Sequence, residues 1–190
     1  DLFKKITVLP DGKNHGLIFI LDWSGSMQYV LQDTLKQLYN LIWFCRKVQI
    51  PFDVYAFTSE YRNRVELRHM DHYDRLKAEK IQHCEREEGF LHVEAEFNLL
   101  HFFTSESNAK ELEKQMINIW RTAYSFKNRS IYGYPHELVL SGTPLNETLV
   151  TLHQLIPQFQ EKTGAEKVQC IILTDGEGSQ IPYNKTVYHH

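Results

Sequence analysis

The run Gly16-Leu-Ile-Phe-Ile-Leu-Asp-Trp-Ser-Gly-Ser26 decides the fold of this chain of 190 residues. Its first six residues are apolar, which is typical of a short strand buried on both faces of a parallel sheet. A carboxylate and two hydroxyls follow directly, from Asp22, Ser24 and Ser26. Because open α/β sheets bind ligands beyond the carboxyl ends of their strands, we expect a site at this point.

The rest of the chain alternates strand and helix patterns. Two further strands are predicted at residues 52–58 and 168–173, and the second is strongly apolar. Apolar residues at three- and four-residue steps predict helices over about 27–48, 109–123 and 145–159. Their stripes are Met27, Val30, Leu31, Leu35, Leu38, Ile42 and Trp43; Ala109, Leu112, Met116, Ile119, Trp120 and Ala123; and Leu145, Leu149, Leu152, Ile156 and Phe159. Asn108 is the expected N-cap of the second helix. This alternation predicts an α/β fold, with a mostly parallel sheet flanked by helices on both faces.

Two more residues, Thr143 and Asp175, have side-chain oxygens at positions suited to this site. Thr143 lies in Ser141-Gly-Thr-Pro-Leu145, ahead of the third helix, and Asp175 follows the last strand, before Gly176. With Asp22, Ser24 and Ser26 they supply two carboxylates and three hydroxyls. An all-oxygen set suits a hard divalent cation, Mg²⁺ first, with Mn²⁺ or Ca²⁺ as alternatives, and argues against zinc or copper. The sequence therefore predicts one metal site built from these five residues.

Simpler roles exist for each element taken alone. Ser24 or Ser26 would serve as a helix cap, and Thr143 followed by Pro144 fits an N-cap with proline at the first helical position. Asp175 and Gly176 form a common turn dipeptide. The three elements together, two of them directly after apolar strands, favour metal binding over these roles.

Composition sets the outer bounds. With 42% apolar and 24% charged residues, the chain suits a single domain over residues 1–190. A net charge of −3 without a basic block gives no sign of nucleic-acid or membrane binding. Cys45, Cys84 and Cys170 are odd in number and widely spaced, which favours a reducing, cytoplasmic compartment. Cys170 is expected to be a buried small hydrophobe. Because the chain begins at Asp1 without methionine, we expect a fragment.

The segment at about 60–96 is the least regular part of the chain and is predicted to be an insertion in the domain. His, Asp and Cys side chains crowd there, namely His69, Asp71, His72, Asp74, His83 and Cys84. A second, softer metal site is one interpretation, but the spacing matches no standard zinc pattern. A solvated, charged insertion is favoured.

The set Asp-x-Ser-x-Ser at 22–26, then Thr143, then Asp175 before glycine, resembles the metal-ion-dependent adhesion site of von Willebrand factor A domains. All five positions match, and the resemblance covers about residues 14–178. It implies a Rossmann-like A-domain fold whose Mg²⁺ keeps one coordination position open for a Glu or Asp of a protein partner. The chain ends soon after Asp175, before the strand and helix that usually complete such a sheet, so we expect a sheet truncated at its C-terminal side.

Local segments narrow the resemblance further. Residues 21–27, 97–104 and 143–149 are similar to the A domain of the cobaltochelatase subunit of aerobic cobalamin biosynthesis, including versions carried by bacteriophages. In that family the A-domain subunit works with a ring-forming AAA+ ATPase, and together they drive metal insertion by a porphyrinoid-binding subunit. The resemblance implies a non-catalytic subunit of a chelatase complex. We expect the acidic linker and ATPase-facing region of the full subunit to be missing from this chain.

Two functional hypotheses follow. In the first, the chain is an accessory subunit of an ATP-driven chelatase or remodelling machine, and the metal grips a partner carboxylate. In the second, it is an adhesion or structural module of a virion or cell surface that uses the same grip. The unpaired cysteines favour the first. Catalysis by this chain alone is not expected, because the sequence places no acid, base or nucleophile beside the predicted ligands.

Overall fold

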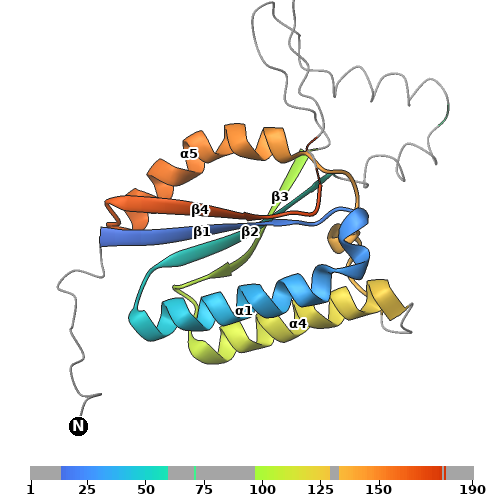
Figure 1. Ribbon diagram of the computed structural model, residues 1–190, viewed down its shortest axis with the longest axis horizontal. Helices are drawn as coiled ribbons and strands as arrows, with labels where there is room; N and C mark the ends of the chain where they lie inside the picture. The colour runs from blue at the N-terminus through green and yellow to red at the C-terminus, as the bar shows by residue number, and fades with distance from the viewer. Residues whose placement is uncertain (1–13, 60–70, 72–96, 129–132, 177, 179–190) are drawn as a thin grey trace, which may run out of the picture.

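A computed structural model describes residues 14–59, 71, 97–128, 133–176 and 178 (Figure 1). They contain a four-stranded sheet in the order β3-β2-β1-β4. The strands are β1 (His15–Asp22), β2 (Phe52–Ser59), β3 (Phe97–Thr104) and β4 (Lys167–Leu173). β1 pairs in parallel with both β2 and β4, whereas β3 runs antiparallel to β2. The carboxyl ends of β1, β2 and β4 therefore share one edge of the sheet.

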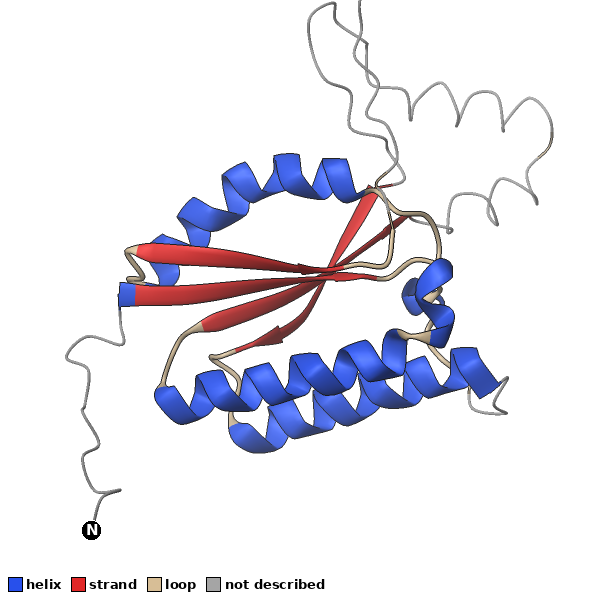
Figure 2. Cartoon of the chain, in the orientation of Figure 1, coloured by secondary structure: helices blue, strands red, loops and turns tan. Residues whose placement is uncertain are grey.

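Helices cover both faces of the sheet, so the predicted α/β layering is confirmed (Figures 1 and 2). α1 (Leu31–Val48) and α4 (Ala109–Asn128) lie on one face, and α5 (Leu145–Thr163) lies on the other. Two short 3₁₀ helices, η2 (Ser26–Tyr29) and η3 (His136–Leu138), occupy connecting segments. The side-chain oxygen of Asn108 accepts a hydrogen bond from the Glu111 N–H at 2.9 Å, which confirms the predicted cap of α4.

The core forms two layers because side chains alternate between the faces of β1. Phe19 and Leu21 pack toward α1 and α4, whereas Ile18 and Ile20 pack toward α5. Gly16 lies under the ring of Phe159 from α5, and a Cβ at this position would overlap that ring. The apolar run of β1 is thus buried on both faces, as its composition predicts.

Some residues of the predicted stripes are exposed, which corrects the expected helix faces. Val30 ends the 3₁₀ turn of η2 instead of lying within α1, so it does not follow the α-helical phase. Trp43 lies one residue beyond Ile42 and points outward, and Leu149 and Ala109 are also exposed. The expected full burial of Cys170 is wrong as well: this side chain is only partly buried, because β4 stands at the edge of the described sheet.

Two further expectations concern the chain as a whole. Within the described part, the helices are too short or too polar for any of them to cross a membrane. The predicted insertion at about 60–96, with its His and Asp group, falls outside the described residues except for Asp71, which is exposed.

Candidate metal centre

Asp22 is the last residue of β1 and is fully buried at the carboxyl edge of the sheet. Its Oδ1 accepts a hydrogen bond from the backbone N–H of Ser24 at 2.9 Å. Its Oδ2 accepts one from the Thr174 hydroxyl at 2.6 Å. The carboxylate is therefore held in one orientation by the residues that follow β1 and β4.

Three more oxygens form a chain beside this carboxylate. The hydroxyls of Ser24 and Ser26 lie 3.0 Å apart, and the Ser26 hydroxyl donates to Oδ1 of Asp175 at 3.0 Å. Adjacent oxygens around Mg²⁺ are also about 3.0 Å apart, because each lies about 2.1 Å from the ion in an octahedron. Ser24 is buried, whereas Ser26 and Asp175 are exposed, so one side of the group faces solvent. The two spacings are those of ordinary hydrogen bonds and are also compatible with neighbouring ligands of Mg²⁺.

Trp23 anchors the loop that carries the two serines. Its ring is fully buried and packs edge-to-face on Phe102 and Phe126, with centroids 5.0 and 5.9 Å away. Its Nε1 donates to the Leu138 carbonyl at 2.8 Å, and its backbone N–H donates to the Phe57 carbonyl at 2.9 Å. With Trp23 fixed in the core, the neighbouring residues on either side are held at the sheet edge.

The segment that contains Thr143 runs alongside the serine loop. Ser141 forms a β-bridge with Ser24, and its carbonyl accepts the Gly25 N–H at 2.9 Å. Thr143 is two residues further on and precedes Pro144, the residue directly before α5. Among the described residues, the Thr143 hydroxyl has no hydrogen bond to the other four predicted ligands. The structure thus brings four of the five residues together, and coordination by Thr143 stays a prediction.

The capping roles considered for these residues are wrong. Pro144, not Thr143, occupies the cap position of α5, and no side chain caps that helix. η2 begins at Ser26 after Gly25, again without a side-chain cap. The turn at Asp175 does exist, because the Gly176 N–H donates to the Thr174 hydroxyl at 3.2 Å.

The sequence interpretation missed Trp23 and Thr174, which orient the site without belonging to the predicted ligand set. Thr174 lies between the last strand and Asp175, and a hydroxyl at this position is the sequence feature that could have identified it as part of the site. Within the described ranges, no group of three or more His, Cys, Asp or Glu side chains is arranged to hold a metal. The candidate centre differs from such groups because two of its four assembled members are hydroxyls.

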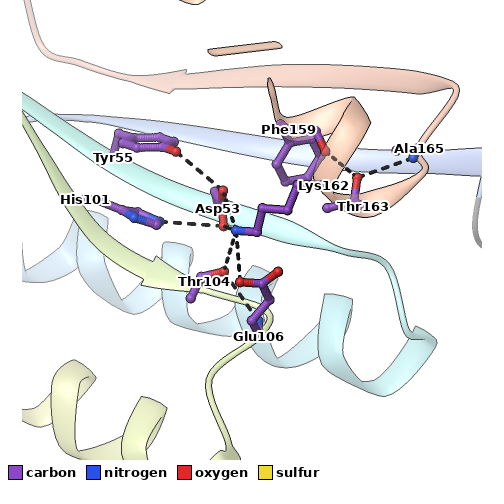
Figure 3. A network of polar contacts seen from close by, with 9 residues as sticks. All are labelled: Asp53, Tyr55, His101, Thr104, Glu106, Phe159, Lys162, Thr163 and Ala165. Atoms are coloured by element: carbon purple, nitrogen blue, oxygen red, sulfur yellow. Dashed lines mark hydrogen bonds and ion pairs between the residues drawn. The ribbon is translucent and has the colours of Figure 1, made fainter. Parts of the chain in front are cut away.

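A second polar cluster lies at the other end of the strands from the candidate metal centre, around Asp53 at the start of β2 (Figure 3). Lys162, near the end of α5, places its Nζ 3.4 Å from Oδ2 of the buried Asp53. The same ammonium lies 3.4 Å from the Thr104 hydroxyl and 3.2 Å from Oε2 of Glu106. On the other side, Nε2 of His101 is 3.6 Å from Oδ1 of Asp53. The cluster ties the end of α5 to β2 and β3.

The electrostatics of this cluster indicate a structural role. Burial alone would raise the pKa of Asp53. Hydrogen bonds from His101 and Thr104 and the positive charge of Lys162 together have a larger, opposite effect, so the pKa of Asp53 lies below its usual value. Burial and the neighbouring Asp53 carboxylate raise the pKa of Tyr55 to about 12. Asp53 is therefore a charged, paired group, and Tyr55 is a neutral phenol that stacks on His101 with ring centroids 4.6 Å apart.

No protein-family model matches this chain, and no curated protein or solved structure is detectably similar to it. A function can therefore be inferred only from the residues at the carboxyl ends of β1 and β4 and from their geometry.

Proposed function

We propose that this chain is a metal-dependent protein-binding module of the von Willebrand factor A type. In this proposal Mg²⁺ is held by Asp22, Ser24, Ser26, Thr143 and Asp175. The observation that supports it most is the oxygen chain of Ser24, Ser26 and Asp175, whose two 3.0 Å spacings match neighbouring ligands of Mg²⁺.

The chemistry of the proposed ligands suits binding of a carboxylate from a protein partner. Three of the five proposed ligands are neutral hydroxyls, so the negative charge at the ion comes only from the carboxylates of Asp22 and Asp175. A divalent ion in such a set supplies an electrophilic position for one more carboxylate. A Glu or Asp of the partner is the expected ligand, and Ser26 and Asp175 stand on the exposed side where it would arrive.

Two exposed apolar side chains close to Ser26 in sequence support protein binding. Tyr29 is 68% exposed only three residues from Ser26, and Val30 next to it is also exposed. Exposed aromatic residues near a charged centre are typical anchors of protein interfaces. A partner that reaches the ion would cover these two side chains.

For the partner we propose a AAA+ ATPase of a cobaltochelatase-like complex, with a porphyrinoid-binding subunit as the third component. This choice rests only on the resemblance of the segments at residues 21–27, 97–104 and 143–149 to that family. The chain would transmit the motion of the ATPase and would not itself catalyse metal insertion. An adhesion or virion module is the alternative, and it would use the same ion to hold a partner without an ATPase.

The experiment is a binding measurement with the purified ATPase subunit of an aerobic cobaltochelatase, by biolayer interferometry. Binding is expected in Mg²⁺, with loss in EDTA and recovery when Mg²⁺ is restored. Glu111→Ala, on exposed helix surface away from the site, is the control and should bind normally. Binding that is equal in Mg²⁺ and EDTA would contradict the metal-dependent grip, and no binding to the ATPase would leave the adhesion alternative as the better account.

A further inference from the structure

The seam between α1 and α4 carries aromatic side chains on its outer side. The two helices lie side by side on one face of the sheet and run antiparallel (Figure 1). The Tyr39 hydroxyl donates to the Met116 carbonyl at 2.7 Å, and the rings of Tyr39 and Trp120 have centroids 6.4 Å apart. The ammonium of Lys36 lies 5.8 Å from the centroid of the Trp120 ring. These contacts fix which side of each helix faces the seam.

Each helix continues this side with exposed apolar residues. On α1, Trp43 lies seven residues after Lys36 and therefore two turns further along the same side. On α4, Ile117 and Tyr124 lie three residues before and four residues after Trp120, so they share its side. Trp43 and Tyr124 are 45% and 46% exposed, and Ile117 is also exposed. A row of exposed apolar residues that includes Trp and Tyr is typical of protein-binding surfaces.

The seam lies toward β3, on the side of the sheet away from β4. The ring of Tyr39 packs edge-to-face on Phe103 of β3, with centroids 5.9 Å apart. β3 and β4 stand at opposite ends of the strand order. The seam is formed by described residues of α1 and α4 alone. It therefore does not depend on what pairs with β4.

The charge of this surface is opposite to that of the whole chain, which has 21 basic and 24 acidic residues. The exposed basic residues on the outer sides of the two helices are Lys36, Lys47, Lys110, Lys114, Arg121 and Lys127. The exposed acidic residues there are Asp33 and Glu113, and Asp33 is paired with Lys36 at 2.8 Å. The one other acidic residue of the two helices, Glu111, lies nine residues before Trp120 and so on the opposite side of α4. The surface is therefore complementary to an acidic partner.

We propose that the seam binds an acidic amphipathic helix of a protein partner, with Trp43, Ile117 and Tyr124 as anchors. Ile117 and Tyr124 are about 10 Å apart along α4. Tyr39 lies level with Met116, so Trp43, four residues later on the antiparallel α1, extends the row beyond Ile117. The row spans about three helical turns, which matches apolar positions i, i+4, i+7 and i+11 of a docked helix. This contact is separate from the candidate metal centre and needs no ion.

A helix suits this surface better than other anionic partners. Asp33 and Glu113 stand among the basic residues, and the continuous negative charge of a lipid or nucleic-acid surface would repel both. A helix with discrete charges can place apolar residues opposite them. Pairing of the seam with the same seam of a second copy would bring the basic residues of the two copies together, which is unfavourable.

The test is binding of labelled synthetic peptides to the full chain, by fluorescence anisotropy. The first peptide is about 18 residues long, with Leu at helical positions i, i+4, i+7 and i+11 and Glu on both sides of this stripe. A second peptide has the same composition in shuffled order, and a third has Lys in place of Glu. The first peptide should bind at micromolar concentration, at least about tenfold more tightly than the other two, and equally with and without EDTA.

Substitutions locate the contact. Trp43→Ala and Tyr124→Ala should each weaken binding of the first peptide about tenfold or more. Phe44→Ala is the matched control and should bind normally, because Phe44 is 56% exposed on α1 but is turned about 100° further from α4 than Trp43. Lys114→Glu combined with Arg121→Glu should reverse the preference, so that the Lys peptide binds more tightly than the Glu peptide.

Circular dichroism verifies that each variant is folded. Failure of the first peptide to bind the full chain would overturn the proposal. So would equal binding of the shuffled peptide, equal effects of Trp43→Ala and Phe44→Ala, or loss of binding in EDTA. Tighter binding to duplex DNA, or to vesicles of phosphatidylcholine and phosphatidylserine in equal parts, than to the first peptide would also overturn it.

Discussion

Thr174→Val is the substitution that probes how the metal centre is oriented. The change keeps the shape of the side chain and removes its hydroxyl, which donates to Oδ2 of Asp22 at 2.6 Å and accepts the Gly176 N–H at 3.2 Å. Asp22 is fully buried, so its Oδ2 would lose a charge-assisted hydrogen bond without access to bulk water. We therefore expect effects on both metal affinity and stability.

The expected magnitude follows from these bonds. Hydrogen bonds to charged groups contribute about 1.5–3 kcal/mol, so the metal-free variant should be less stable by that amount in urea melts. Loss of a group that orients a metal-binding residue typically weakens metal affinity about 10–100-fold. Isothermal titration with Mg²⁺ measures this second effect on the same protein.

Thr34→Val is the matched control, because the Thr34 hydroxyl donates only to the Val30 carbonyl within α1, away from the predicted ligands. It should leave Mg²⁺ affinity unchanged. If Thr174→Val binds Mg²⁺ as tightly as the wild type, the assigned role of Thr174 in orienting Asp22 is wrong.

Three further substitutions test the packing and the polar cluster. Leu38→Ala removes a fully buried side chain of α1 and should lower the free energy of unfolding by about 2–5 kcal/mol in denaturant melts. Leu41→Ala, on the exposed side of the same helix, is the control and should lower it by less than about 1 kcal/mol. Equal effects of the two substitutions would show that the buried face of α1 is misassigned. Asp53 has a lowered pKa, so its stabilising contribution is present above the ordinary carboxyl pKa near 4 and is lost as pH falls through its folded value. Asp53→Asn should therefore cost about 1–3 kcal/mol at pH 7 and should show a smaller loss of stability between pH 5 and 2 than the wild type; an unchanged acid profile would contradict the pairing with Lys162.

The sequence was sufficient for the helices and for three of the four described strands because these depend on local pattern, but it did not predict β3 (Phe97–Thr104) or its antiparallel pairing with β2. The apolar run before Asp22 predicted a strand buried on both faces, and three- and four-residue periodicity located all three helices. The positions of Asp22 and Asp175 followed from the rule that parallel strands end at one edge. Ser26 and Asp175 are 149 residues apart in sequence and yet share a hydrogen bond, as this rule predicts.

Other features depend on tertiary contacts that periodicity does not contain. The 3₁₀ turn at η2 shifts the helical phase, so Val30 could not be assigned to a face in advance. The partial exposure of Cys170 reflects the place of its strand at the edge of the described sheet, which an apolar run alone does not reveal. The cluster at Asp53 joins residues from β2, β3 and α5 that are separated by up to 109 positions, and no local pattern connects them.

The most direct test of the metal centre is Mg²⁺ binding by isothermal titration to the wild type and to Asp22→Ala and Asp175→Ala. The account predicts one ion per wild-type chain and no measurable binding in either variant, because each removes one of the two carboxylates that balance the cation. Metal-free Asp22→Ala should be less stable than the metal-free wild type, because it removes a buried carboxylate that accepts hydrogen bonds from the Ser24 N–H and the Thr174 hydroxyl. Mg²⁺ binding that is the same in the wild type and in both variants would contradict the assignment of this site.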